Sequence, residues 1–130
     1  MKIFVFGSNT GGCHRGGAAH HAYKKHGARW GEGVGHFGDS YAIPTKLGHK
    51  EHGVGKTLPL EVIKGFVEGF IAYAMVHPEL TFQVTCIGCG LAGLKHEDVA
   101  PMFQNAPGNC YFDTLWKPYL PEGVEFWGTF

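Results

Sequence analysis

The chain has 130 residues, 11 basic and 11 acidic residues and therefore no formal net charge, which argues against a nucleic-acid-binding surface of clustered Lys and Arg. Its length predicts a single domain over residues 1–130. The longest apolar stretch, residues 70–76, is too short to span a membrane, and we recognise no signal peptide. With four cysteines and no export signal, we expect a cytoplasmic protein with reduced thiols.

The first predicted element is a strand over residues 2–6, an unbroken apolar run typical of a strand covered on both faces. A glycine-rich loop follows it. Residues 17–28 predict a short helix, and Gly27 is a plausible C-terminal stop. Residues 29–40 predict a second glycine-rich loop.

The middle of the chain predicts a short strand and a long loop. The strand covers residues 41–45, and Pro44 places it near an end or edge. Residues 46–57 are polar and rich in glycine, so we expect a long surface loop. Within it, "GVGKT" suggests a phosphate-binding loop, but the required earlier glycine is Lys50. Thr57 is instead expected to cap the next helix.

A long helix is predicted from Pro59 to just before Pro78, because apolar residues recur three and four positions apart. Strands that alternate with helices predict an α/β fold, a three-layer α/β/α arrangement around a mostly parallel sheet. The remaining predicted elements are a strand over residues 80–87, a short helix over 95–106, a strand over 109–114 and an edge strand over 124–130.

The pair Cys86 and Cys89 has the spacing of half a zinc site, and His49 and His52 could supply the other half. A redox dithiol is a second alternative, although it would sit at a helix N-terminus. Cys86 falls in the predicted strand 80–87, so we favour a third interpretation, in which cysteine is a small buried apolar residue. We therefore expect no metal.

Two glycine-rich loops follow the ends of predicted strands, at residues 7–18 and 88–94. In an open parallel α/β sheet, ligands bind outside the carboxyl ends of the strands. Free backbone N–H groups and the helix dipole there favour phosphate. The alternative is that the glycines only permit tight turns. The candidate ligand-binding residues are Gly7, Ser8, Asn9, Gly16, Gly17, Ala18, Gly88, Cys89, Gly90, Leu91, Ala92 and Gly93.

The segments "FGSNTGGCHRGGAAHHAYKKHGA", "SYAIPTK" and "FQVTCIGCGLAGLKHEDVAPMF" together resemble a macrodomain over about residues 3–104, and resemble compact phage and bacterial macrodomain-like proteins. The resemblance implies a domain that binds ADP-ribose or a related nucleotide. It implies that Asn9 contacts the distal ribose, that residues 16–18 line this ribose and the diphosphate, and that residues 88–92 wrap the diphosphate. Lys46 matches the reactive Lys of a deacylating branch.

Two features depart from that family. The acidic partner of the reactive Lys is replaced by Ala92, and the chain begins at the strand that carries Asn9, without the preceding strands and their adenine-reading Asp. Asp39 could replace the missing carboxylate if its loop folds over the site. His14 could donate to a phosphate or act as an acid, or it could simply be solvated. The catalytic candidates are thus Lys46, Asp39 and His14.

From these observations we expect a domain that binds a small-molecule nucleotide such as ADP-ribose, with no cofactor and with no nucleic-acid or membrane partner. Weak hydrolysis of an ADP-ribosyl ester or phosphate is compatible with this expectation, although the catalytic set is incomplete. The alternatives are a nucleotide-sequestering or sensing module without turnover, and a protein-interaction domain.

Overall fold

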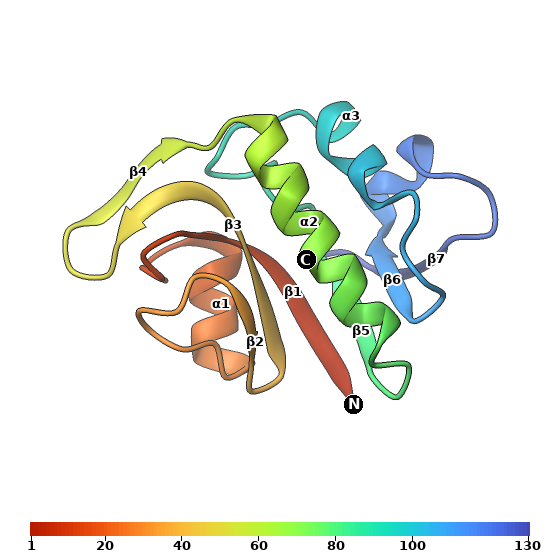
Figure 1. Cartoon of the computed structure of the whole chain (residues 1–130), viewed down its shortest axis with the longest axis horizontal. Coiled ribbons are helices and arrows are strands. Elements are labelled where there is room, and N and C mark those ends of the chain that lie inside the picture. The colour runs from red at the N-terminus through yellow and green to blue at the C-terminus, as the bar shows by residue number, and fades with distance from the viewer.

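The computed structural model describes all residues 1–130, and its seven strands form one mixed sheet in the order β2-β3-β1-β5-β6-β7, with β4 paired to β3 (Figure 1). The predicted α/β class is confirmed. The elements in chain order are β1 (Lys2–Asn9), α1 (Gly17–Lys25), β2 (Gly35–Phe37), β3 (Ser40–His49), β4 (Gly53–Thr57), α2 (Leu60–Met75), β5 (Thr81–Val84), α3 (His96–Val99), the 3-10 segment η1 (Ala100–Phe103), β6 (Cys110–Asp113), the 3-10 segment η2 (Thr114–Tyr119) and β7 (Glu125–Gly128).

β1 lies in the middle of the sheet because its apolar side chains are buried on both faces. It pairs in parallel with β3 on one side and with β5 on the other. β5 pairs in parallel with β6, and β6 with β7, which forms the sheet edge expected of residues 124–130. β2 and β4 each pair with β3 in antiparallel fashion.

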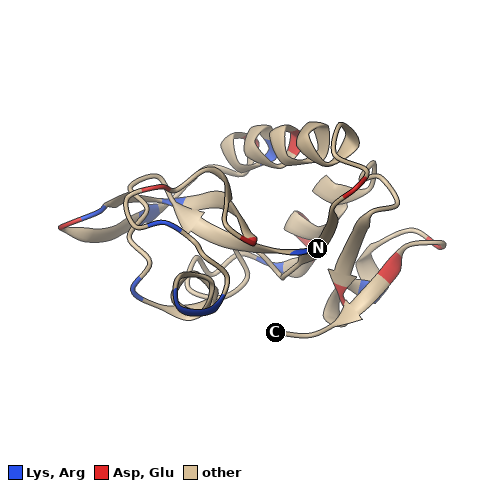
Figure 2. Ribbon diagram, turned by 90° about the horizontal axis from the view of Figure 1, so that it is seen from below, with Lys and Arg blue, Asp and Glu red and all other residues tan.

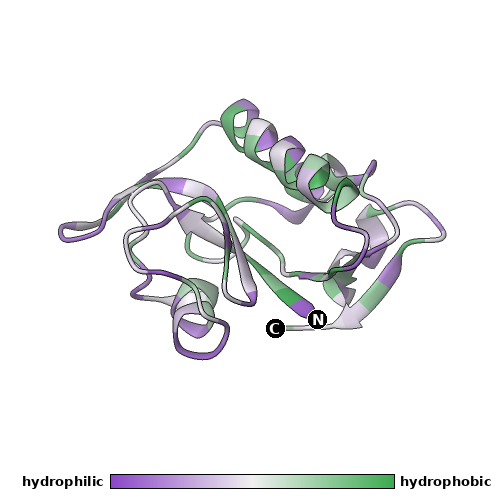
Figure 3. Ribbon diagram, turned by 60° about the horizontal axis from the view of Figure 1, so that its bottom comes forward, coloured by the Kyte–Doolittle hydropathy of each residue, from purple (hydrophilic) through white to green (hydrophobic).

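Helices pack against both faces of the sheet, as Figure 2 shows for α2 and α1. Side chains alternate along β1, so Ile3 and Val5 join the cluster under α2, while Phe4 and Phe6 join the cluster under α1. Figure 3 shows that β1 is hydrophobic and that the tip of the β3–β4 hairpin is hydrophilic. None of the helices has the length and apolar character that crossing a membrane requires. The buried stripe of α2 consists of Ile63, Val67, Phe70, Ile71 and Ala74.

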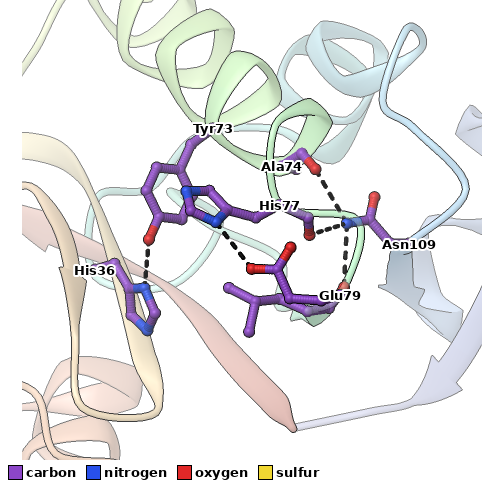
Figure 4. Close-up of polar contacts among 7 residues, drawn as sticks. His36, Tyr73, Ala74, His77, Glu79 and Asn109 are labelled. Atoms are coloured by element: carbon purple, nitrogen blue, oxygen red, sulfur yellow. Dashed lines mark hydrogen bonds and ion pairs between the residues drawn. The ribbon is translucent and has the colours of Figure 1, made fainter.

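The ends of the two longer helices are set by local contacts. α1 stops before Gly27, which has a φ of 75° and is the predicted stop. At the end of α2, the side-chain amide of Asn109 donates to the carbonyls of Ala74, His77 and Leu80 at 3.0–3.1 Å (Figure 4). These bonds tie the end of α2 and the turn that follows it to the residue before β6.

The prediction of a loop over residues 46–57 is wrong, because this segment forms a β-hairpin. β3 extends to His49 and pairs with β4, with Lys46 opposite Thr57. The hairpin projects from the sheet, and its residues are exposed or only partly buried. It therefore lacks the apolar alternation that identifies a half-buried strand in a sequence.

The predicted helix cap at Thr57 is also wrong. Thr57 ends β4, and α2 begins after Pro59 without a side-chain cap. The hydroxyl of Thr57 instead donates a 2.9 Å hydrogen bond to the carbonyl of Ala92. This bond ties the hairpin to the glycine-rich turn that follows β5.

Further boundaries differ from those predicted. The strand predicted over residues 2–6 continues to Asn9, so Gly7, Ser8 and Asn9 belong to β1 and not to the loop after it. The helix expected over residues 95–106 is only the four-residue α3 followed by η1, where Pro101 supplies no backbone N–H. The loop expected over residues 29–40 contains β2, a three-residue strand. β5 ends at Val84, so Cys86 lies beyond the strand rather than within it.

Candidate functional site

A cavity of about 530 Å³ opens where the chain leaves β1 and β5. From β1 the chain passes through α1 to β3 on one side, and from β5 it passes through α3 to β6 on the other. Adjacent strands whose connections diverge in this way form the crevice in which α/β proteins bind ligands. The lining residues are Gly7, Ser8, Asn9, Cys13, Gly16, Gly17, Ala18, Ala19, Thr45, Lys46, Val54, Thr85, Cys86, Ile87, Gly88, Cys89, Gly90, Leu91, Ala92, His96, Asp113, Leu115 and Phe130.

One wall of the cavity is the N-terminus of α1. His20 donates to the carbonyl of Gly16, as in the first turn of a helix. The N–H groups of Gly17, Ala18 and Ala19 precede that bond, so they have no acceptor within the helix. All three residues line the cavity, where the positive end of the helix dipole favours an anion.

The facing wall is the turn from Gly88 to Gly93. Three backbone bonds close it, from Cys89 to Cys86, from Gly93 to Gly90 and from Leu94 to Gly88. The remaining N–H groups of the turn have no acceptor in the protein. They belong to Gly88, Gly90, Leu91 and Ala92, all of which line the cavity. A series of free N–H groups in a turn is a typical anion-binding arrangement.

Two of the predicted ligand residues line the cavity with side chains that are already engaged. The amide of Asn9 donates to the carbonyl of Cys13 at 2.8 Å and accepts from its N–H at 3.0 Å. The hydroxyl of Ser8 donates to the carbonyl of Gly33. Both side chains therefore hold the loops in place, and the Asn9 amide uses one N–H and one lone pair of its oxygen for this purpose. Gly93, also predicted, is not among the residues that line the cavity.

Lys46 is the only cationic side chain in the cavity lining. Its Nζ atom lies 3.4 Å from the carbonyl oxygen of Leu91, at the entrance of the turn. Neighbouring Thr45 is buried and donates to the carbonyl of Ser8 at 3.3 Å, which fixes the end of β3 against β1. Lys46 is thus placed to pair with an anion bound at the turn.

The other two catalytic candidates lie outside the cavity lining. Asp39 precedes β3 at the opposite end of the sheet, where its carbonyl accepts from Phe4 and its N–H donates to His26. The loop that carries Asp39 does not fold over the cavity. His14 is completely buried, and its Nε2 atom lies 2.9 Å from the carbonyl of Arg29. It is therefore neither the solvated side chain nor the phosphate donor considered from the sequence.

The environment of His14 is largely apolar. Its ring packs between the side chains of Phe6, Tyr23 and Trp30, and its Nδ1 atom has no hydrogen-bond partner. Burial lowers the pKa of His14 below the ordinary value, although hydrogen bonds to backbone carbonyls partly oppose this shift.

Sequence reasoning missed several residues of the site, among them the ionisable side chains of Asp113 and His96. Asp113 ends β6 and is buried; one carboxylate oxygen accepts from Leu115 N–H at 2.9 Å, and the other accepts from Thr129 and Phe130 at 3.0 and 3.2 Å. The signal available was its position at the end of the predicted strand 109–114, because carboxyl ends of parallel strands meet at one edge.

His96, at the start of α3, lines the same cavity and accepts a 2.9 Å hydrogen bond from the indole of Trp116. This contact joins segments 20 residues apart in the chain. No local pattern in the sequence indicates it.

Cys86 and Cys89 are free thiols with raised pKa values. Burial, followed by the nearby carboxylate of Asp113, raises the pKa of Cys86 to about 12, and burial raises that of Cys89 to about 11. His49 and His52 stack on each other near the hairpin tip, with ring centroids 4.4 Å apart. The four residues form no metal-binding group, and no three His, Cys, Asp or Glu side chains elsewhere do so.

Comparison with known proteins gave no match, whether to a family model, to a curated protein or to a solved structure.

Proposed function

We propose that the cavity binds ADP-ribose or a related nucleotide, with the diphosphate held by backbone N–H groups. The observation that carries this proposal is the presence of free N–H groups on both walls, in the turn 88–92 and at the N-terminus of α1. Lys46 adds the single cationic side chain between them. A cavity of about 530 Å³ is in the range of small-molecule sites.

The proposal includes a three-layer, mostly parallel, macrodomain-like fold. Its support is the packing of α1 and α2 on opposite faces of the sheet and the succession of the loops at residues 7–18 and 88–94 at adjacent strand ends. We also propose a cytoplasmic location, which the four free cysteines favour.

Within this proposal, ligand binding without efficient turnover fits the residues better than hydrolysis. Lys46 has no carboxylate beside it, since Ala92 occupies the turn and Asp39 lies at the far end of the sheet. Asp113 is the only carboxylate side chain in the lining, and both of its oxygens hold backbone or side-chain donors. The cavity therefore has the groups that a sensing or sequestering module needs. A hydrolase also needs a general base, which the cavity does not offer.

Isothermal titration calorimetry with ADP-ribose, ADP and NAD tests the proposal directly. We expect saturable binding of at least ADP-ribose, weakened by salt because an anion is being bound. Absence of heat with all three ligands at millimolar concentration would refute it. Mass spectrometry of small molecules released from the purified protein by denaturation gives an independent check on ligand identity.

A further inference from the structure

A buried indole determines which nitrogen of His96 carries the proton. Trp116 is completely buried, and its Nε1–H lies 2.9 Å from His96 Nδ1. An indole nitrogen can only donate, so Nδ1 must offer its lone pair. Neutral His96 therefore carries its proton on Nε2. A hydrogen bond to a buried, fixed donor holds both the ring orientation and the tautomer.

The Nε2–H group of His96 has no acceptor within the protein. The ring is partly buried, lines the cavity and lies alongside Tyr119, with ring centroids 6.1 Å apart and an interplanar angle of 15°. Since Nδ1 is engaged by Trp116, Nε2–H is the only polar group that the ring offers to the cavity. A few fixed polar groups in an otherwise apolar lining determine which ligand a pocket accepts.

The charges in the cavity indicate that the acceptor is not the diphosphate itself. Asp113 caps η2, the segment that contains Trp116, so the carboxylate and His96 belong to the same end of the cavity. Its negative charge disfavours a phosphate there. Lys46 and the free N–H groups of the turn favour the phosphates at the other wall.

We infer that His96, held as the Nε2–H tautomer by Trp116, is a specificity-determining residue that donates to a neutral acceptor on the part of the ligand outside the diphosphate. This inference rests on the proposed function, which supplies the diphosphate. A ring nitrogen or carbonyl of a nucleobase and a hydroxyl of a ribose both provide such an acceptor.

Two substitutions at His96 separate the ligand contact from the structural one. In His96→Asn the shorter amide places its oxygen near the Nδ1 position, so it can accept from Trp116 but cannot donate into the cavity. In His96→Gln the longer amide reaches the Nε2 position, so it can donate into the cavity but leaves Trp116 without an acceptor. We therefore expect His96→Asn to have the higher melting temperature of the two variants and His96→Gln to have the higher affinity for the ligand.

Calorimetry with pyrophosphate, ADP and ADP-ribose provides the affinities. His96→Asn should weaken ADP-ribose binding about 3- to 10-fold, the effect of one hydrogen bond, and should leave pyrophosphate binding unchanged. A loss shared by ADP would assign the acceptor to the nucleoside, and a loss confined to ADP-ribose would assign it to the distal ribose. An equal loss with pyrophosphate, or no loss with any ligand, would overturn the inference while leaving the proposed function intact.

Binding of none of the three ligands by the unsubstituted protein would instead refute the proposed function, and the inference with it. The tautomer has its own test, which does not depend on folding of the variants. Long-range ¹H–¹⁵N correlation spectra of the histidine rings should show His96 protonated at Nε2. A proton on Nδ1 would exclude the hydrogen bond from Trp116 and overturn the inference.

Discussion

Lys46 and Leu91 are 45 positions apart in the chain, yet the Lys46 Nζ atom lies 3.4 Å from the Leu91 carbonyl oxygen. The contact brings the one cationic side chain of the cavity to the turn whose N–H groups are free. A carbonyl is a weaker partner for an ammonium group than a phosphate, so a bound diphosphate should replace it.

Lys46→Ala should therefore weaken ADP-ribose binding by about 1 to 3 kcal/mol, the contribution of a charge-assisted hydrogen bond. Lys56→Ala is the matched control, because Lys56 is exposed on β4 and does not line the cavity. Calorimetry at low salt measures both affinities. Equal affinities of the two variants would show that Lys46 does not contact the anion. Because Lys46 has no base beside it, any hydrolysis of ADP-ribosyl esters should be weak.

Gly88 and Gly90, in the turn that follows β5, should respond differently to a methyl group. Gly88 has a φ of 76°, and a Cβ atom there would lie 2.9 Å from a methyl carbon of Leu94. Gly90 lacks a positive φ, and a Cβ atom there would meet nothing within 4 Å. Gly88→Ala should lower the free energy of unfolding by about 1 to 2 kcal/mol, whereas Gly90→Ala should be nearly neutral.

Urea denaturation of both variants measures this difference. A larger loss of stability for Gly90→Ala would show that the turn adopts another conformation. Because Gly90 has no positive φ and open space around a Cβ atom, a side chain at this position interferes with binding only if it occupies the space of the ligand.

His14 should make the protein less stable in mild acid. Burial lowers its pKa below the value of about 6.5 that it has in the unfolded chain, so the unfolded state binds the proton more readily. The contribution of His14 to stability is therefore complete above pH 6.5 and falls as the pH drops below it. His14→Gln retains a donor to the carbonyls of Arg29 and Glu32 but cannot be protonated.

The melting temperature of His14→Gln should consequently decline less between pH 7 and pH 5 than that of the unsubstituted protein. His20→Gln provides the control, since His20 is exposed on α1, the helix that follows the loop of His14. Parallel pH profiles for all three proteins would mean that His14 does not titrate in this range. His26, whose pKa is lowered by burial and by His21, accounts for a further part of the acid sensitivity.

Cys86 and Cys89 should be poor nucleophiles in the folded protein. Because their pKa values are raised to about 12 and about 11, no more than about one thiol in a thousand is ionised at pH 8. Alkylation by iodoacetamide at pH 8 should be about 100-fold slower than that of free cysteine, and unfolding in urea should restore the rate. Rapid modification of the folded protein, located by peptide mass spectrometry, would contradict these pKa values.

The metal alternative has a separate test. We expect elemental analysis to find no stoichiometric zinc, and we expect a chelator to leave the melting temperature unchanged. Stoichiometric zinc, lost together with stability on chelation, would restore the alternative site of Cys86, Cys89, His49 and His52.

The central part of the fold could be predicted from the sequence because its signals are local. The apolar run at residues 2–6, the stripe of α2 and the glycine-rich turn at residues 88–93 each depend on neighbouring residues alone. The hairpin could not be predicted, since its exposed strands carry no apolar periodicity and β4 is held by pairing with β3. Propensity is a weak guide wherever tertiary pairing decides the conformation.

Part of the site could be predicted because its signals, like those of the central fold, are local in the sequence. Backbone groups of the two loops follow from strand ends and glycines, and the end of the predicted strand 109–114 could have indicated Asp113 in the same way. His96 is held at the cavity by Trp116, a contact that no local pattern indicates. Asp39 was misplaced because it directly precedes β3, which puts it at the amino end of this strand, opposite the carboxyl ends that form the cavity. His14 was misplaced because its burial depends on Tyr23 and Trp30, which belong to α1 and to the following loop.

Close backbone contacts at Gly11 and Gly48 join the loop after β1 to the β3–β4 hairpin, which affects how this part of the protein unfolds locally. A Cβ atom at Gly11 would clash with the backbone of Gly48, and one at Gly48 would clash with the side chain of Asn9. The loop after β1 and the hairpin thus touch backbone to backbone, so neither can separate without exposing the other. We expect their amide hydrogens to exchange with solvent as one cooperative unit, slower than an isolated hairpin would and together with the wall of the cavity that they support.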